Sequence, residues 1–94
     1  MIQVLEVFRI DNYERWKRSY EDGEGDRRAN GSREAFVYRN KDNASEIVIL
    51  HQWGNLENAK NFFESSEFKD RMKKAGVRGE PLIQYFEEID RIIG

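Results

Sequence analysis

The sequence predicts an α+β fold, a ferredoxin-like sandwich in which the elements follow the order β-α-β-β-α-β. Three observations lead to this prediction. Four segments are rich in β-branched and aromatic residues, two segments between them carry apolar residues at helical spacing, and turn residues mark the boundaries. Two split β-α-β units with right-handed crossovers give an antiparallel sheet with strand order 4-1-3-2 and helices on one face. The first and third strands then lie in the centre, and they are the two most apolar strands.

The first strand is predicted over residues 3–10, because this segment mixes β-branched and aromatic residues. A helix follows, with Asp11 as its N-cap and Glu14 completing the pattern of a capping box. Gly23 and Gly25 are expected to end this helix. Its apolar stripe, at spacing i, i+3, i+4, i+7, consists of Tyr13, Trp16, Lys17 and Tyr20, with Lys17 contributing its aliphatic stem.

A polar connection over residues 26–32 contains an Asn-Gly turn signal and leads to the second strand, predicted over residues 33–40. In that strand Ala35 and Val37 alternate with Phe36 and Tyr38 on the other side. Residues 41–45 turn the chain, and the third strand is predicted over residues 46–53.

A second helix is predicted to begin after Asn55 as its cap. Its apolar stripe consists of Leu56, Ala59, Phe62 and Phe63. Serines are good caps, so a break is expected at Ser65–Ser66, followed by a short helical segment that ends at Gly76. Residues 77–81 are predicted to be a loop, and Leu82 begins the last strand.

The composition predicts one domain over residues 1–94, because chains divide into several domains only at greater lengths. Charged residues make up 36% of the chain, yet the net charge is only −2, which is not the charge of a nucleic-acid-binding protein. The sequence has no cysteine, no signal-peptide pattern and no apolar run long enough to span a membrane. We therefore expect a cytoplasmic protein with neither nucleic acid nor membrane as a partner.

The predicted sheet is apolar on both faces. In the third strand Ile47 and Ile49 point to one face while Val48 and Leu50 point to the other, and the first and last strands repeat this pattern. One face packs on the helices, so the other exposes more apolar area than a soluble monomer usually carries. We expect a second copy of the chain to cover it, giving a homodimer that pairs through the sheet face.

The stretch from Trp53 to Gly76, WGNLENAKNFFESSEFKDRMKKAG, contains a tryptophan that ends a strand, followed by a broken helix with Ser65 and Phe68 at the break. In this pattern the chain resembles the dimeric α+β barrel superfamily, close to antibiotic biosynthesis monooxygenase-like proteins, and the resemblance covers nearly the whole chain. It implies a chain that pairs into a dimeric α+β barrel. The superfamily includes cofactorless oxygenases, haem-degrading enzymes, isomerases, decarboxylases and stress-response proteins.

The resemblance does not extend to haem or metal. Haem-degrading members carry an asparagine on the first strand and a histidine in the second helical segment, whereas this first strand has no asparagine and Met72 stands at the histidine's place. With one histidine and no cysteine, a first-row metal site would need several carboxylates, and no spacing suggests one. We therefore predict no cofactor and no metal site.

His51 and Trp53 are the predicted catalytic residues. Histidine side chains change charge near neutral pH, so His51 is a candidate general base at the mouth of a cavity between sheet and helices. By strand parity it shares a face with Ile47, Ile49 and Trp53. The alternative is a structural histidine that is hydrogen-bonded at the sheet end or at the dimer contact.

A small aromatic ligand is the expected partner of an aromatic-lined cavity. The predicted lining residues are Tyr13, Trp16, Tyr38, Phe62 and Tyr85, although aromatic stripes at helical spacing are more often simply core. Among the charged residues, the pair Arg27–Arg28 is the best candidate for an anion site, with solvated surface as the alternative. Glu6, an acid in a central strand, is expected to face an arginine of the partner chain across the dimer interface.

Three functional hypotheses follow from the sequence. The first is a cofactor-independent monooxygenase or isomerase that acts on a small aromatic compound. The second is a small-molecule-binding or stress-related barrel protein without turnover. The third is a purely structural dimer whose interior is filled by its own side chains, and the presence or absence of a cavity separates it from the other two.

Overall fold

A four-stranded antiparallel sheet organises the computed structural model, which describes residues 1–94. The strands lie in the order β2-β3-β1-β4, which is the predicted order read from the other edge. The prediction of a ferredoxin-like α+β fold is confirmed. The elements are β1 (Ile2–Ile10), α1 (Tyr13–Asp22), α2 (Glu24–Ala29), β2 (Ser32–Arg39), β3 (Glu46–Trp53), α3 (Leu56–Phe63), α4 (Ser66–Lys74) and β4 (Val77–Glu87).

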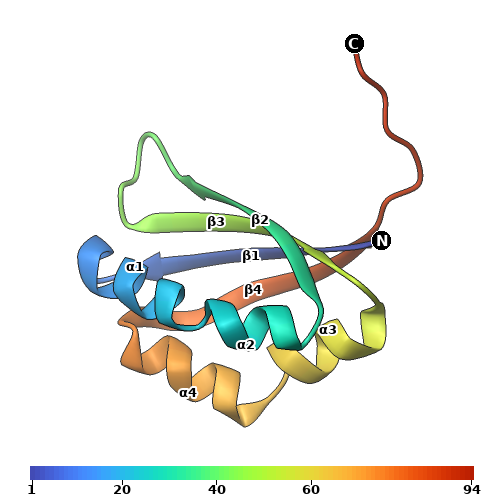
Figure 1. Ribbon diagram of the computed structural model, residues 1–94. Coiled ribbons are helices and arrows are strands. Elements are labelled where there is room, and N and C mark those ends of the chain that lie inside the picture. The colour runs from blue at the N-terminus through green and yellow to red at the C-terminus, as the bar shows by residue number, and fades with distance from the viewer.

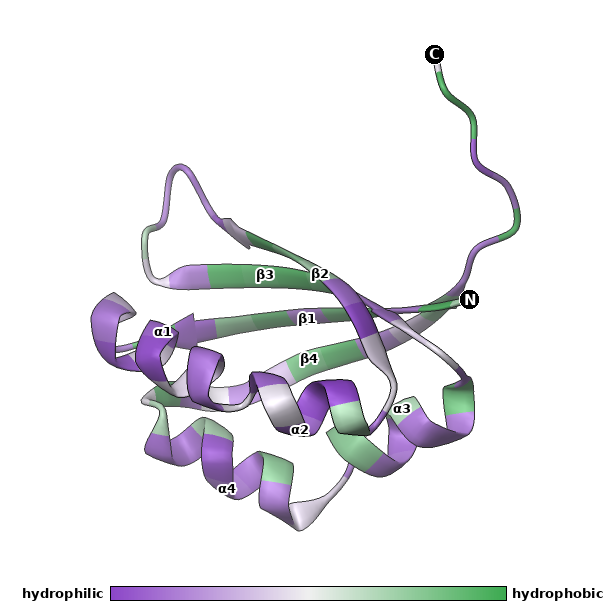
Figure 2. Ribbon diagram, in the orientation of Figure 1, coloured by the Kyte–Doolittle hydropathy of each residue, from purple (hydrophilic) through white to green (hydrophobic).

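The four helices cover one face of this sheet and leave the other free (Figure 1). On the covered face the side chains are buried, and they include Val4, Glu6, Phe8, Ile47, Ile49, His51 and Trp53. Leu5 pairs with Leu50, and Val7 pairs with Val48 and Leu82, so these side chains lie together on the opposite side of the sheet, which we call the open face. We define the apolar band of the open face as Leu5, Val7, Phe36, Tyr38, Val48, Leu50, Leu82 and Phe86. Figure 2 shows the apolar residues concentrated along β1, β3 and β4, whereas α1 is mostly hydrophilic.

The buried apolar side chains of the covered face form two clusters rather than one. Phe8, Trp16 and Ile49 belong to the first cluster, at the end of the sheet where α1 packs. Val4, Trp53 and Phe63 belong to the second, where α3 packs. Between the two clusters, at the middle of β1 and toward the end of β3, lie Glu6 and His51, the two buried polar residues.

The helix caps are mostly as predicted, with one exception. Asn55 caps α3 and Ser65 caps α4, so the predicted helix break at the serines is confirmed. The predicted Asp11 cap of α1 is wrong, because Asn12 Oδ1 accepts the bond from the Arg15 amide at 2.9 Å. Asp11 instead pairs with Arg78 Nε at 2.8 Å, which ties the end of β1 to β4.

The connection between α1 and β2 differs from the prediction. Gly23 and Gly25 do not end helical order: α1 stops at Asp22, but α2 begins at Glu24 and continues to Ala29. The segment has no strongly apolar residue, so no hydrophobic periodicity marked it as a helix. The predicted Asn-Gly turn follows directly, and Gly31 there has φ +116, a conformation that favours glycine.

The last strand begins earlier than predicted. β4 starts at Val77 rather than Leu82, so the segment expected to be a loop extends the sheet. β4 is an edge strand, where Pro81 is tolerated because one side of the strand needs no ladder hydrogen bond. After Glu87 the chain leaves the sheet, and residues 88–94 extend away from the body of the molecule (Figure 1). None of the helices combines the length and the apolar character needed to cross a bilayer.

Candidate active site

Glu6 and His51 form a buried hydrogen-bonded pair in the middle of the covered face. His51 Nε2 lies 2.9 Å from Glu6 Oε2, and the two side chains are 0% and 4% exposed. This is the geometry of an imidazole N–H that donates to a carboxylate oxygen. The other polar atom of each side chain, His51 Nδ1 and Glu6 Oε1, is buried without a hydrogen-bond partner. Buried polar atoms are rarely left unpaired in proteins, so this pair has capacity to bind something further.

Aromatic rings surround the imidazole. Its ring centroid lies 5.4 Å from that of Phe63, 6.0 Å from that of Trp53 and 6.5 Å from that of Tyr20. These rings exclude water from the pair, and a low local dielectric strengthens every electrostatic interaction that the pair makes.

A cavity of about 50 Å³ lies between the sheet and the helices, and Glu6 forms part of its wall. Its other walls are largely aromatic, from Phe8, Trp16, Tyr20, Phe62, Phe63 and Phe68. Arg27 of α2 and Arg71 of α4 complete the lining on the solvent side, where Arg71 pairs with Asp26. The side chains therefore do not fill the interior completely, although a space of about 50 Å³ is smaller than an aromatic ring needs.

The polar groups at this cavity are perturbed by their surroundings. Burial raises the pKa of Tyr20, with the nearby Arg27 opposing that rise. Burial also lowers the pKa of Arg27, and the neighbouring Tyr20 and Glu6 act in the opposite direction. The Arg27 guanidinium lies 3.7 Å from the Tyr20 ring centroid, a cation–π contact that holds both groups at the entrance.

The predicted catalytic residues are both fully buried. His51 shares the covered face with Trp53, as strand parity predicted, but it lies behind Glu6 and does not line the cavity. Trp53 packs on Phe62 and Phe63, and its indole N–H donates to the backbone oxygen of Asn30 at 2.9 Å. The position expected for His51, at the cavity mouth, is instead held by the arginines.

The five predicted lining residues divide into three groups. Trp16 and Phe62 line the cavity. Tyr13, the first residue of α1, packs against Trp16 and beneath Arg39. Tyr85 packs against the cluster that contains Trp53, and its hydroxyl is buried without a hydrogen-bond partner. Tyr38 projects from the open face and is 55% exposed, so it lies on the opposite side of the sheet from the cavity.

The prediction for Glu6 is wrong in a way that changes the site. It was expected to meet a partner arginine at the dimer interface, but it lies on the covered face and binds His51. Glu6 alternates in phase with Val4 and Phe8, but both faces of β1 are apolar, so this pattern does not indicate which face the helices cover. No group of three or more His, Cys, Asp and Glu side chains in the structure is arranged to hold a metal ion.

Comparison with solved structures gives the class of fold. A provisionally named antibiotic biosynthesis monooxygenase from Bordetella bronchiseptica has 14% identity and a TM-score of 0.74, with 94% of this chain and 96% of that one covered. SnoaB, a cofactor-independent oxygenase from Streptomyces nogalater, has 9% identity and a TM-score of 0.74, with 97% and 95% covered. Rv0793 from Mycobacterium tuberculosis has 13% identity and a TM-score of 0.71, with 96% of each chain covered.

These likenesses show that the chain shares the fold of these proteins over nearly its whole length, which is the fold that the Trp53–Gly76 pattern predicted. Because the sequence identities are this low, the likenesses show the fold and say nothing about the reaction. No protein-family model matches the sequence, and no curated protein matches it. The chemistry therefore rests on the side chains of this chain.

Proposed function

We propose that the chain is a cofactor-independent enzyme of the monooxygenase type, which takes a proton from a small aromatic substrate. One observation carries the proposal: Glu6 lines an aromatic cavity with one carboxylate oxygen bound to His51 and the other, Oε1, buried without a hydrogen-bond partner. The fold that the chain shares with a cofactor-independent oxygenase supports the reaction class.

Each group has a distinct role in the proposed reaction. Glu6 accepts the proton, because it is the member of the pair that faces the cavity. His51 positions the carboxylate through the 2.9 Å hydrogen bond and shares the proton charge once the transfer occurs. The aromatic walls keep water away from the resulting carbanion, which protects it from simple reprotonation.

The electron count of such a reaction closes without a cofactor. When a substrate methylene becomes a carbonyl, the substrate gives up four electrons and two hydrogens. One O₂ accepts these four electrons, with one oxygen atom entering the product as the carbonyl and the other leaving as water. The protein needs only to remove the first proton and to exclude solvent, which are the two tasks that Glu6 and the aromatic cavity suit.

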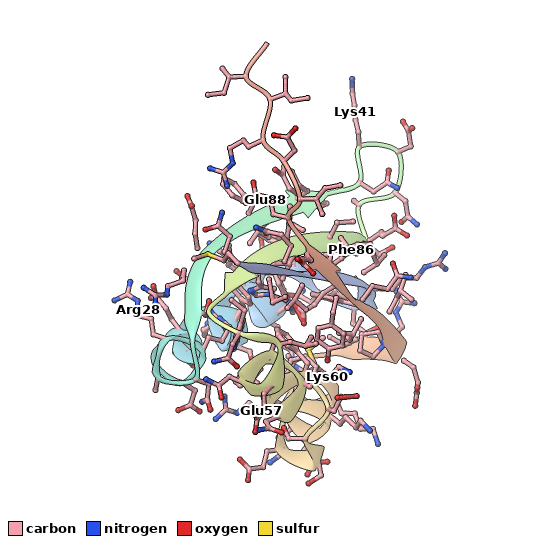
Figure 3. The ribbon with its side chains drawn as sticks, turned by 90° about the vertical axis from the view of Figure 1, so that its right-hand side faces the viewer. Arg28, Lys41, Glu57, Lys60, Phe86 and Glu88 are labelled. Atoms are coloured by element: carbon pink, nitrogen blue, oxygen red, sulfur yellow. The ribbon has the colours of Figure 1, made fainter.

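The test is oxygen consumption with a panel of phenols and aromatic ketones that carry an acidic C–H. We expect uptake of O₂, with one ¹⁸O atom from ¹⁸O₂ in the product by mass spectrometry. Glu6→Gln keeps the shape of the side chain and removes the base, so kcat/KM should fall by roughly 100-fold or more. The control is Glu57→Gln, at an exposed position on α3 (Figure 3) that lies outside the cavity and the groove.

Three results would contradict the proposal. The first is the absence of O₂ uptake with every compound of the panel. The second is a Glu6→Gln variant that is folded by circular dichroism and keeps full activity. The third is product formation without O₂, which would identify an isomerase. A matching His51→Ala variant that turns over at the wild-type rate would remove His51 from the reaction and leave Glu6 alone.

We further propose that the functional unit is a homodimer that pairs through the open face. Four large side chains of the apolar band are about half exposed in the single chain: Phe36 43%, Tyr38 55%, Leu82 50% and Phe86 48%. Covering several hundred Å² of apolar surface is worth on the order of 10 kcal/mol before association costs. Polar residues interrupt the face at one end, where Gln3 and Gln52 pair across β1 and β3. Native mass spectrometry of freshly purified protein reports the subunit count and any retained small molecule together.

A further inference from the structure

Arg27 differs from every other arginine of the chain in its burial. It projects from α2 toward the cavity and is half-buried, whereas all the other arginines are exposed. Its guanidinium stacks on the Tyr20 ring at 3.7 Å. No carboxylate lies within ion-pair distance of it, while its neighbours Arg28 and Arg71 are paired with Glu24 and Asp26. A half-buried guanidinium with no anionic partner is costly unless an anion binds there.

The backbone is shaped to leave room for this guanidinium. A Cβ atom added at Gly23 would lie 3.0 Å from Arg27 Nη1, which is tighter than nine in ten real Cβ contacts. Gly23 has φ −84, so a side chain there would cause no backbone strain. A side chain at this position would therefore displace the guanidinium, at the end of its flexible side chain, rather than the backbone.

Arg27 and Tyr20 stand between two spaces. On the inner side is the aromatic cavity of about 50 Å³, with Glu6 in its wall. On the outer side is a polar groove of about 270 Å³, whose charged lining also includes Lys17, Arg28 and Arg33 and the acidic Glu21, Glu24 and Glu34. A cavity of about 150 Å³ is what benzene requires, so the inner space alone is too small for a ring. A ring would therefore need Tyr20 and Arg27, which line both spaces, to move apart and join them.

We propose that this site selects aromatic carboxylates: Arg27 binds the carboxylate at the junction of groove and cavity, and the ring enters toward Glu6. The inference deepens the proposed function, because it names the substrate class of the same site. The guanidinium fork matches a carboxylate in a bidentate geometry, and the Tyr20 face and the Trp16 and Phe62 rings are apolar partners for an aromatic body.

The placement of charge favours this orientation of the ligand. Glu6 at the far wall would repel a carboxylate, whereas Arg27 at the entrance attracts it. An anionic ring is therefore held with its charged end at the arginine and its uncharged edge, which carries the acidic proton, against the Glu6 carboxylate. In this orientation Arg27 binds the carboxylate end of the ligand, and Glu6 contacts the opposite edge of its ring.

The experiment is a binding titration that needs no turnover. Wild-type protein is titrated with 2-naphthoate and with the neutral, equally shaped 2-naphthamide, followed by tryptophan fluorescence and calorimetry. We expect naphthoate to bind about tenfold or more tightly than naphthamide, and Arg27→Gln to remove that preference. The matched control is Arg18→Gln, at an exposed arginine of α1 that lines neither space and should keep the preference.

A second variant protects the test against misfolding. Gly23→Ala keeps the charge of Arg27 but crowds its guanidinium, so the naphthoate preference should fall part of the way. Equal binding of acid and amide by wild-type protein, no binding of either, a preserved preference in Arg27→Gln, or an equal loss in Arg18→Gln would each overturn the inference. A clear naphthoate preference in a protein that consumes no O₂ with any substrate would support the inference and contradict the proposed function.

Discussion

The two faces of the sheet are built from the same strands but differ in where their polar residues lie. The covered face is apolar at both ends and polar in the middle, where Glu6 and His51 lie between two clusters of buried side chains. The open face is apolar in the middle and polar at one end, where Gln3 and Gln52 lie side by side. Because adjacent residues of a strand point to opposite faces, one strand carries both patterns at once. The covered face therefore carries the proposed reaction site, and the open face carries the proposed contact between copies of the chain.

The largest expected effect comes from the covered face. Trp53→Ala removes a fully buried ring that packs on Phe62 and Phe63, so we expect the free energy of unfolding to fall by about 3–5 kcal/mol. The measurement is urea denaturation at two protein concentrations, and the loss should be the same at both, because Trp53 packs within one chain. A loss that disappears at high protein concentration would place Trp53 at a contact between chains instead.

The open face gives the next largest effect. Leu50→Lys puts an ammonium group in the apolar band, and a two-fold dimer would bury that group twice. We expect the dimer dissociation constant to rise by about 100-fold or more, which corresponds to about 2.7 kcal/mol, measured by analytical ultracentrifugation. Gln52→Lys is the matched control, since it lies on the same strand and face two residues away in the polar end. A wild-type protein that sediments as a monomer at micromolar concentration would refute the dimer outright.

The smallest effect concerns pH. Burial raises the pKa of Tyr20 and that of Tyr85 above the ordinary value of 10.0. The folded protein therefore holds these protons more tightly than the unfolded chain, and the resulting stability is fully present below pH 10 and is lost as pH rises through the folded values. We expect urea denaturation to show a fall in stability above pH 10 that is reduced in Tyr20→Phe and smallest in the double variant with Tyr85→Phe. An unchanged profile in the double variant would rule out these two side chains as its cause.

Much of the fold could be predicted because alternation and helical spacing are local properties of the sequence. The strand order, the caps at Asn55 and Ser65 and the two-sided apolar sheet all follow from such patterns. The helix α2 could not be predicted in this way, since none of its six residues is strongly apolar. Its only sequence signal is the Glu24–Arg28 pair at spacing i, i+4.

The site was harder to predict than the fold, because it depends on register between strands. His51 could be placed on the correct face, but its partner could not, since Val4 lies opposite His51 and Glu6 lies opposite Ile49 in the ladder. The pair is therefore diagonal, and only the side-chain lengths bring its atoms to 2.9 Å. Tyr38 illustrates the complementary difficulty: its alternation with Val37 was clear, but nothing local says which of the two faces the helices will cover.

The turn at Gly31 links the entrance of the site to the rim of the sheet. Trp53 donates to the carbonyl of Asn30, and a Cβ atom at Gly31 would lie 3.0 Å from the same indole nitrogen, at a backbone φ of +116. Any side chain there would strain the turn and push the indole, and α2 ends just before it. Substitutions at this surface turn should therefore displace the Trp53 ring and disturb the end of α2, the helix that carries Arg27, without changing any residue that lines the cavity.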